Sequence, residues 1–167
     1  MDLKDLLDTN AIVANLKVGG KKQALSELAR RAGQLSGVNA REILASLLER
    51  ERLGSTGVGM GVAIPHAKLA GIDRPIGLFA RLDSPVDFDA VDDQPVDLIF
   101  VLLVPETAGA DHLKALARVS RLFRQRKIGA RLRGARGKDA LYAVLTGSET
   151  DTAAPDTKQV ASQSRAS

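Results

Sequence analysis

The sequence predicts an α/β fold in which a single mixed β-sheet is flanked by helices on both faces. Residues 96–104 read VDLIFVLLV, a nearly continuous apolar run that is typical of a strand covered on two sides. Amphipathic helical patterns come before it, over residues 21–32 and 39–51, and after it, over residues 112–127. Because helices and strands interleave along the chain, we expect helical layers on both faces of one sheet.

The N-terminal part of the chain begins with a short predicted helix over residues 2–7 and a predicted edge strand over residues 11–18. In residues 21–32, apolar side chains recur at the spacing of one helix face, and Gly33 is the expected C-cap. These elements would form one edge of the sheet and the first covering helix.

The second amphipathic helix carries its own start and stop signals. Asn39 can cap it and Glu42, three residues on, can complete a capping box. The helix is expected to end near Glu51, and Gly54 marks the break. The glycine-rich residues 54–61 then predict a loop or a bulged strand entry into the short strand Val62-Ala63-Ile64.

Three further elements complete the prediction. Residues 75–82 alternate in the manner of a strand. Asp111 can cap a helix that begins at His112 and runs to about Lys127, and residues 137–146 predict a last helix.

Length and composition indicate one domain over residues 1–147. The chain has 167 residues, of which 44% are hydrophobic and 26% charged, as in ordinary globular proteins. Residues 148–167 contain almost no large apolar side chain, so this segment is expected to be a disordered tail.

Composition also narrows the compartment and the chemistry. The acidic N-terminus does not resemble a secretory signal, and the apolar run over residues 98–104 is far shorter than the roughly 20 residues of a membrane helix, so no membrane insertion is expected. Cysteine is absent, which excludes disulfides, thiolate metal sites and a cysteine nucleophile. A cytoplasmic location fits these features.

The net charge of +4 is unevenly distributed, because one region is crowded with cations. Such a cluster could bind an acidic protein face or nucleic acid, or could simply be a solvated helix face. With aromatic residues at only 3%, nucleic-acid binding is the less favoured of these. The cluster comprises Arg118, Arg121, Arg124, Arg126, Lys127, Arg131, Arg133, Arg136 and Lys138.

The common enzyme motifs do not fit this sequence. The stretch GSTGVGMGVAIPH has neither a Walker ending nor GxGxxG spacing, and Ser55 in LGSTG does not form a nucleophile elbow. Two histidines without paired spacing make a weak zinc site, so neither metal nor cofactor is expected. The acids of residues 87–93 could serve acid/base catalysis but are more typical of a solvated turn.

His66 in GVAIPHAKL is the most informative residue. Pro65 is poorly suited to the middle of a central strand, so His66 is expected at a strand exit. The alternative is a partly buried histidine satisfied by backbone groups. A neutral imidazole is itself a nucleophile, which makes phosphoryl transfer, supported by cations, amides and a second imidazole, a candidate reaction.

Three separated motifs resemble one family. RERLGSTGVGMGVAIPHAKL, FDAVDDQPVDLIFVLLVP and DHLKALARVSRLF occur in the order found in the enzyme IIA domain of the fructose/mannitol class of the bacterial phosphotransferase system, and look most like its nitrogen-regulatory branch. The resemblance covers roughly residues 3–146 and implies the IIA fructose/mannitol-type fold.

The resemblance also implies roles for particular residues. His66 would accept a phosphoryl group from an HPr-like carrier, Arg50 would balance its charge, and His112 would hydrogen-bond the phosphoryl oxygens or steady the site. Arg52 is a rival for the role of Arg50, and His112 has the alternative of a purely structural residue. Lys68 could bind phosphate or a partner protein, or could simply be exposed. The backbone amides of the preceding glycine-rich loop could donate hydrogen bonds to the phosphate, at Gly57, Gly59 and Gly61.

Function is left with three alternatives. The chain could be a regulatory phosphocarrier whose phosphorylation state controls partner proteins, or a sugar-transport IIA component that passes phosphate to a IIB domain. A non-catalytic interaction module that uses the arginine-rich helix is the third. In the first two, the chain is a component of a phosphotransferase chain rather than an enzyme that converts a metabolite.

Overall fold

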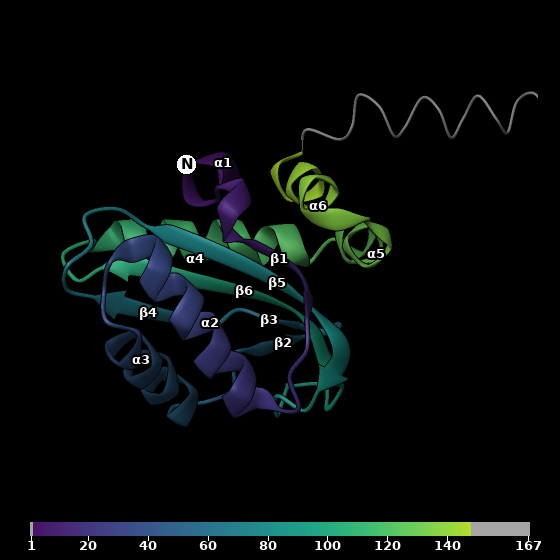
Figure 1. The fold of residues 1–167 in the computed structure, drawn as a ribbon, viewed down its shortest axis with the longest axis horizontal. Coiled ribbons are helices and arrows are strands. Elements are labelled where there is room, and N and C mark those ends of the chain that lie inside the picture. Colours follow the sequence, from purple (N-terminus) through teal and green to yellow (C-terminus); the bar gives the residue numbers. More distant parts are fainter. Residues whose placement is uncertain (1, 148–167) are drawn as a thin grey trace, which may run out of the picture.

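The computed structural model describes residues 2–147 of the chain, and the predicted disordered tail lies outside them. One mixed six-stranded sheet runs in the order β1-β5-β6-β3-β2, with β4 also paired to β6 (Figure 1). The fold class predicted from the sequence is confirmed. The strands are β1 Ile12–Leu16, β2 Gly57–Gly59, β3 Val62–Ala63, β4 His66–Leu69, β5 Ile76–Val86 and β6 Val96–Pro105.

Strand β6 is the centre of the sheet. It pairs antiparallel with β5 and parallel with both β3 and β4, and all its residues except Asp97 are buried. The aromatic core forms around it, where the ring of Phe123 lies 6.0 Å from that of Phe100 and 6.2 Å from that of Phe79. The predicted doubly covered strand is therefore confirmed, and β1 lies at a sheet edge as expected.

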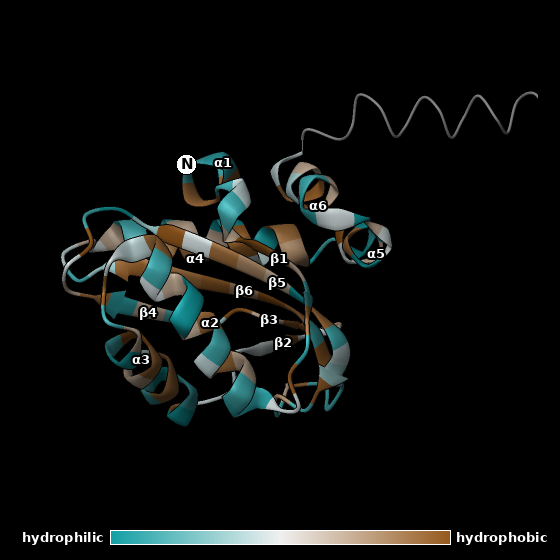
Figure 2. Cartoon of the chain, in the orientation of Figure 1, coloured by the Kyte–Doolittle hydropathy of each residue, from teal (hydrophilic) through white to brown (hydrophobic). Residues whose placement is uncertain are grey.

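Helices cover both faces of the sheet. Helices α2 (Lys21–Ser36) and α3 (Ala40–Arg52) lie on the face nearer the viewer in Figure 1, and α4 (Ala110–Phe123) lies behind it. The short N-terminal helix α1 (Leu3–Leu6), the 3₁₀ turn Thr9–Ala11, α5 (Arg126–Gly134) and α6 (Gly137–Thr146) complete the chain. Figure 2 shows β5 and β6 as largely apolar strands, and α2 and α3 in front of them as helices that mix hydrophilic and hydrophobic residues.

The predicted end of α2 at Gly33 is wrong. The helix continues to Ser36 and is capped by Gly37, whose φ of 79° is the left-handed conformation that favours glycine. Gly33 has a different purpose, since a Cβ there would lie 3.0 Å from the carbonyl oxygen of Val38 and 3.4 Å from the Cβ of Ala40. A glycine in the last turn thus permits close backbone packing instead of ending the helix.

The predicted helix over residues 112–127 is two helices. Its cap is Gly109 instead of Asp111, α4 ends at Phe123, and α5 begins at Arg126. Phe123 and Ile128 are both buried, yet at about 100° per residue a continuous helix would place them roughly 140° apart. The break lets both side chains enter the core.

Within the described residues, every helix falls short of the length and apolar character that a membrane crossing requires.

Candidate functional site

His66 is the first residue of β4, a strand that was not predicted. Strands β3 and β4 both pair parallel with β6, with Ala63 opposite Ile99 and His66 opposite Leu102. Pro65 lies between them, where its carbonyl accepts a hydrogen bond from the Leu102 amide at 2.9 Å. Because Pro65 has no amide hydrogen to donate, it sits at a junction between strands where no ladder bond is lost.

The hydrogen bonds of His66 define its tautomer. Nδ1 lies 2.9 Å from the carbonyl oxygen of Ile64, which can only accept, so Nδ1 carries the proton. Nε2 is then the unprotonated nitrogen, and it accepts a hydrogen bond from Nε of Arg50 at 3.2 Å. The nucleophilic lone pair of the imidazole is therefore on Nε2 and next to a cation.

Arg50 reaches His66 from the last turn of α3. Its Nη1 also donates to the carbonyl oxygen of Gly54 at 2.8 Å, which fixes the guanidinium at the helix end. Its rival, Arg52, forms an ion pair with Glu49 at 3.1 Å in which both side chains are mostly exposed. Of the two arginines, Arg50 is the one that contacts the histidine.

His112 comes to the same place from the first turn of α4. The centroid of its ring lies 6.0 Å from that of His66, at an interplanar angle of 49°. Nδ1 of His112 is buried and has no hydrogen-bond partner among the described residues. A buried polar nitrogen without a partner costs roughly 1–3 kcal/mol, so the ring is held beside His66 despite an unfavourable term.

These side chains border one open pocket of about 640 Å³. Lys68 and Arg50 are its cations, and Glu49 is its only carboxylate among the described residues. Leu53, which is 83% exposed, also borders it and adds an apolar surface. The lining consists of Ala45, Ser46, Glu49, Arg50, Leu53, His66, Ala67, Lys68 and His112.

The environment keeps His66 neutral. Burial is the largest cause that lowers the pKa of His66, and the charges of Arg50 and His112 lower it further. The hydrogen bond to the Ile64 carbonyl and the charge of Glu51 oppose this shift. The pKa of His112 is also lowered, first by burial and then by Lys68. Near neutral pH, both rings are therefore uncharged and His66 keeps a free lone pair.

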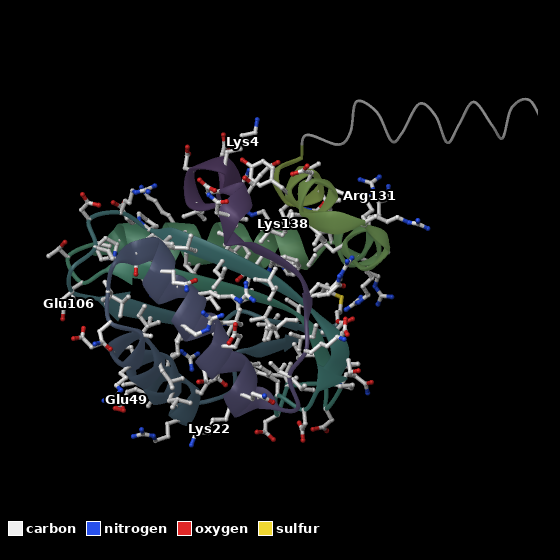
Figure 3. All side chains as sticks on the ribbon, in the orientation of Figure 1. Lys4, Lys22, Glu49, Glu106, Arg131 and Lys138 are labelled. Atoms are coloured by element: carbon white, nitrogen blue, oxygen red, sulfur yellow. The ribbon has the colours of Figure 1, made fainter. Side chains whose placement is uncertain are left out.

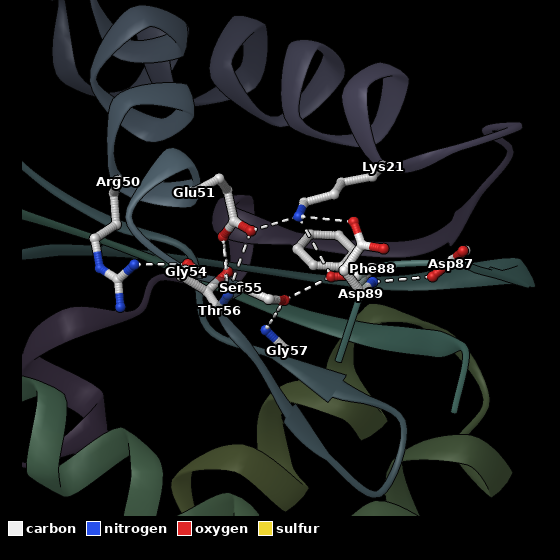
Figure 4. Close-up of polar contacts among 10 residues, drawn as sticks. All are labelled: Lys21, Arg50, Glu51, Gly54, Ser55, Thr56, Gly57, Asp87, Phe88 and Asp89. Atoms are coloured by element: carbon white, nitrogen blue, oxygen red, sulfur yellow. Dashed lines mark hydrogen bonds and ion pairs between the residues drawn. The ribbon is translucent and has the colours of Figure 1, made fainter. Parts of the chain in front are cut away.

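A buried polar network supports the loop after Arg50 (Figure 4). The Glu51 side chain is 6% exposed, forms an ion pair with Nζ of Lys21 at 2.7 Å, and accepts hydrogen bonds from the amide and hydroxyl of Thr56. Nζ of Lys21 also lies 3.3 Å from the carbonyl oxygen of Phe88 and 5.0 Å from the centroid of its ring. The network thus joins α2, the end of α3 and the loop that follows it.

Sequence reasoning did not find this network, although the sequence carries a signal for it. Glu51 continues the spacing of the buried Ile43 and Leu47, so a carboxylate lies on the apolar stripe of α3. A charge in such a position needs a buried partner. The identity of that partner, Lys21, depends on the packing of α2 against α3 and is not a local property of either helix.

The three predicted loop glycines lie elsewhere. Gly57 and Gly59 belong to β2, which pairs antiparallel with β3 through an irregular register, so the alternative of a bulged strand describes this segment. The carbonyl oxygen of Gly61 accepts from the amides of Asp97 and Leu98. None of the three borders the pocket of His66, so the structure gives no support to a role for them in holding phosphate. Among residues 2–147, no group of three or more histidines and carboxylates could hold a metal ion.

The fold is that of a IIA component of a phosphotransferase system. Residues 5–148 match the family described as phosphoenolpyruvate-dependent sugar phosphotransferase system, EIIA 2, and the chain belongs to that family.

Within the family, the chain is similar to nitrogen regulatory proteins. It is 56% identical over 145 residues to the nitrogen regulatory protein of Bradyrhizobium diazoefficiens, covering 87% of this chain and 95% of that one. The crystal structure of nitrogen regulatory protein IIA-Ntr from Neisseria meningitidis matches with a TM-score of 0.82 and 39% identity, covering 86% of this chain and 99% of that one. The fructose-specific EIIA component of Haloferax volcanii is 40% identical over 126 residues, covering 75% and 80% of the two chains. The resemblance inferred from the three motifs is confirmed.

Proposed function

We propose that the chain is a phosphocarrier that accepts a phosphoryl group on Nε2 of His66 from a phosphorylated HPr-like protein. The observation that carries this proposal is the fixed tautomer: Nδ1 donates to the Ile64 carbonyl, and the free lone pair on Nε2 lies at an open pocket beside Arg50. The lowered pKa of His66 keeps that lone pair available at neutral pH.

The transfer needs no proton movement at His66. The Nε2 lone pair forms the new bond to phosphorus as the bond between phosphorus and the carrier breaks, and the bonding electrons return to the carrier. Nδ1 keeps its proton throughout and, through the Ile64 carbonyl, stabilises the positive charge that develops on the ring. Arg50 exchanges its hydrogen bond with Nε2 for phosphoryl oxygens, since its planar fork suits two of them.

Lys68 and His112 complete the proposed site. Lys68 borders the pocket and contributes positive charge, which stabilises the charge spread over the transferred group. His112 offers a ring whose buried nitrogen has no other partner within the described residues. We propose that it orients the phosphoryl oxygens or the ring of His66.

We propose that phosphorylation regulates the binding of partner proteins, as the names of the nitrogen regulatory relatives suggest. A phosphate on His66 adds up to about two negative charges to a pocket bordered by cations. Leu53 is 83% exposed, and Leu113, beside His112, is 65% exposed. Phosphorylation would change the charge at the centre of this apolar surface and therefore which partner proteins bind to it. We expect these partners in the cytoplasm.

A sugar-transport role is the second candidate. It is favoured by the 40% identity with a fructose-specific EIIA component. In that case the phosphoryl group would pass from His66 to a IIB domain, and the same residues would serve both transfers.

Phosphorylation in vitro tests the proposal. Incubation with phosphoenolpyruvate, the first phosphotransferase enzyme and an HPr-type carrier should give an acid-labile, base-stable phosphate on the wild type and none on His66→Ala. Equal labelling of both proteins would overturn the assignment of His66. A pull-down with the two phosphorylation states then separates the two roles, because a regulatory target should be retained in one state only, and a IIB domain should discharge the phosphorylated form.

A further inference from the structure

The C-terminal quarter of the described chain carries a concentration of positive charge that the proposed function does not use. Residues 110–147 contain ten lysines and arginines but only two acids, Asp111 and Asp139. Some of these cations have structural partners: Arg133 forms hydrogen bonds with Asp97 at 2.8 and 2.9 Å and with the carbonyl oxygen of Met60. Arg118 and Arg121 raise the question of what anion they bind, because the described residues satisfy them poorly.

Three arginines of this region line a pocket of about 300 Å³ between α1, α4, α5 and α6. In Figure 1, α1, α5 and α6 lie along the β1 edge of the sheet and α4 lies behind it, and Figure 3 shows Arg131 projecting from α5. Apolar side chains form one part of the lining: Leu3, Leu122, Ile128, Val144 and Leu145. The polar part includes Arg118, Arg121, Gln125 and Arg131.

Two of these arginines have hydrogen-bonding capacity that the described residues leave unused. Nη2 of Arg118 lies 3.5 Å from Asp2, at the long limit for an exposed pair, and such pairs contribute little. Nε of Arg118 is buried and has no partner among the described residues. Arg121 is exposed and forms no ion pair or hydrogen bond within residues 2–147. A buried guanidinium nitrogen without an acceptor is unfavourable unless a ligand supplies one.

The pocket is separate from the proposed phosphorylation site. The two pockets share no lining residue. Both involve α4, but at about 100° per residue Arg121 lies on the opposite side of the helix from His112. A ligand bound between α4 and α6 would therefore leave His66 accessible.

We propose that this pocket binds a small phosphate-bearing molecule with an apolar or ring-containing part, such as a nucleotide. Guanidinium groups bind phosphate oxygens with two donors at once, and several of them together favour a ligand with more than one negative charge. The apolar floor suits a ring or alkyl group, and the volume is at the lower end of the range for small-molecule sites. A nucleic acid strand fits less well, because Tyr142 is the chain's only tyrosine, it does not border this pocket, and tryptophan is absent.

Binding of ADP to the unphosphorylated full chain tests the proposal. In a ¹H–¹⁵N NMR titration at constant ionic strength, ADP should shift the amides of Leu122, Gln125 and Val144 and leave those of Ser46 and Ala67 in place. Arg118→Gln combined with Arg121→Gln should weaken ADP binding at least about tenfold, because charge-assisted hydrogen bonds are lost. The matched control is Arg124→Gln combined with Arg136→Gln, which removes the same charge from residues outside the pocket and should change the affinity less than about threefold.

Several results would overturn the proposal. One is that neither ADP nor pyrophosphate binds at millimolar concentration, and another is that both variant pairs weaken ADP binding equally. A third is that ADP shifts only amides in the pocket of His66. A fourth is that a short oligonucleotide binds to the same residues more tightly than ADP does. Thermal unfolding of both variants checks that they are folded. No carrier or phosphoenolpyruvate is present, so failure here would leave the phosphocarrier proposal standing, and His66→Ala should bind ADP as the wild type does.

Discussion

The reactivity of His66 rests on one carbonyl and one guanidinium, which assign the proton to Nδ1 and the lone pair to Nε2. Burial, Arg50 and His112 together place the pKa of His66 below its ordinary value near 6.5. The nucleophilic, neutral form therefore persists as the pH falls through 6.5 and is lost only below the lowered pKa.

NMR titration of the two histidines tests this shift. We expect both imidazoles to titrate below pH 6.5, with His112→Gln used for assignment. The same shift has a consequence for stability: below pH 6.5 the unfolded chain binds a proton that the folded His66 does not, so the free energy of unfolding falls as the pH falls through that range. His66→Gln should show a smaller fall. A His66 that titrates at or above 6.5 would contradict the proposed cause.

Replacing Arg50 should slow phosphoryl acceptance. Arg50→Gln removes the donor nearest to Nε2 and should lower the rate by about a hundredfold, as for the loss of one charge-stabilising donor in other active sites. Arg50→Lys keeps the charge but not the fork, so an intermediate loss of about tenfold is expected. Arg52→Gln is the control, because Arg52 does not border the pocket and makes no contact with His66, and it should leave the rate near that of the wild type. Equal rates for Arg50→Gln and Arg52→Gln would refute the assignment. Single-turnover labelling by the phosphorylated carrier gives these rates.

Sequence alone indicated His66, Arg50 and His112 as a group, because three motifs could be matched in order, and the structure brings these residues together. The sequence could not show which ring nitrogen of His66 carries the lone pair. The Ile64 carbonyl that fixes the tautomer is aligned only once β3 and β4 pair with β6. The choice between Arg50 and Arg52 likewise depends on which side of α3 faces β4.

At the scale of elements, the ion pair between Lys21 and Glu51 connects α2 to the loop that positions Arg50. Lys21→Met leaves the carboxylate of Glu51 buried with only Thr56 as partner, so the free energy of unfolding should fall by about 2–3 kcal/mol. Phosphoryl acceptance should also slow, because the loop loses an anchor. Urea unfolding and the labelling assay measure the two effects.

The neighbouring Lys22 provides the control for this change. Lys22 is exposed, and no ion pair joins it to the described residues, so Lys22→Met should leave stability within about 0.5 kcal/mol of the wild type. The double variant Lys21→Met with Glu51→Leu removes both charges and should recover part of the lost stability. If Lys21→Met and Lys22→Met behaved alike, the network would have no structural importance.

Elements with strong local patterns could be predicted, and those that depend on distant partners could not. The apolar run of β6 and the amphipathic stripes of α2 and α3 are properties of their own residues. Strand β4 has only four residues, HAKL, directly after a proline, and it becomes a strand because β6 offers a free edge. Helix α5 contains Gly129 and Gly134 and lacked a clear pattern, yet it forms because Ile128 and Leu132 are buried.

At the scale of the whole molecule, the sheet separates two functional regions. Its α2 and α3 side carries Arg50 and the supporting network, whereas α5 and α6 pack at the far edge beside β1 (Figure 1). Helix α4 connects the two regions, since its first turn holds His112 and its later turns hold Arg118 and Arg121. Helix α5 contributes Ile128 and Arg131 to the arginine-lined pocket, so this pocket depends on how α5 is attached to the sheet.

Arg81 of β5 makes part of that attachment, together with the hydrogen bonds from Arg133 of α5 to Asp97 of β6. Nε of Arg81 donates to the carbonyl oxygen of Ala14 at 3.0 Å, and its Nη1 donates to those of Leu132 at 2.7 Å and Ala135 at 2.6 Å. Arg81→Met leaves these carbonyls without a donor and should lower the free energy of unfolding by about 2–3 kcal/mol. Amide hydrogen exchange should quicken most in α5 and α6, because those helices lose their hydrogen bonds to β5.

The exposed Arg74 provides the control, and Arg74→Met should change neither the free energy of unfolding nor the exchange rates. Exchange that quickened uniformly across the sheet would instead show that Arg81 supports the core as a whole.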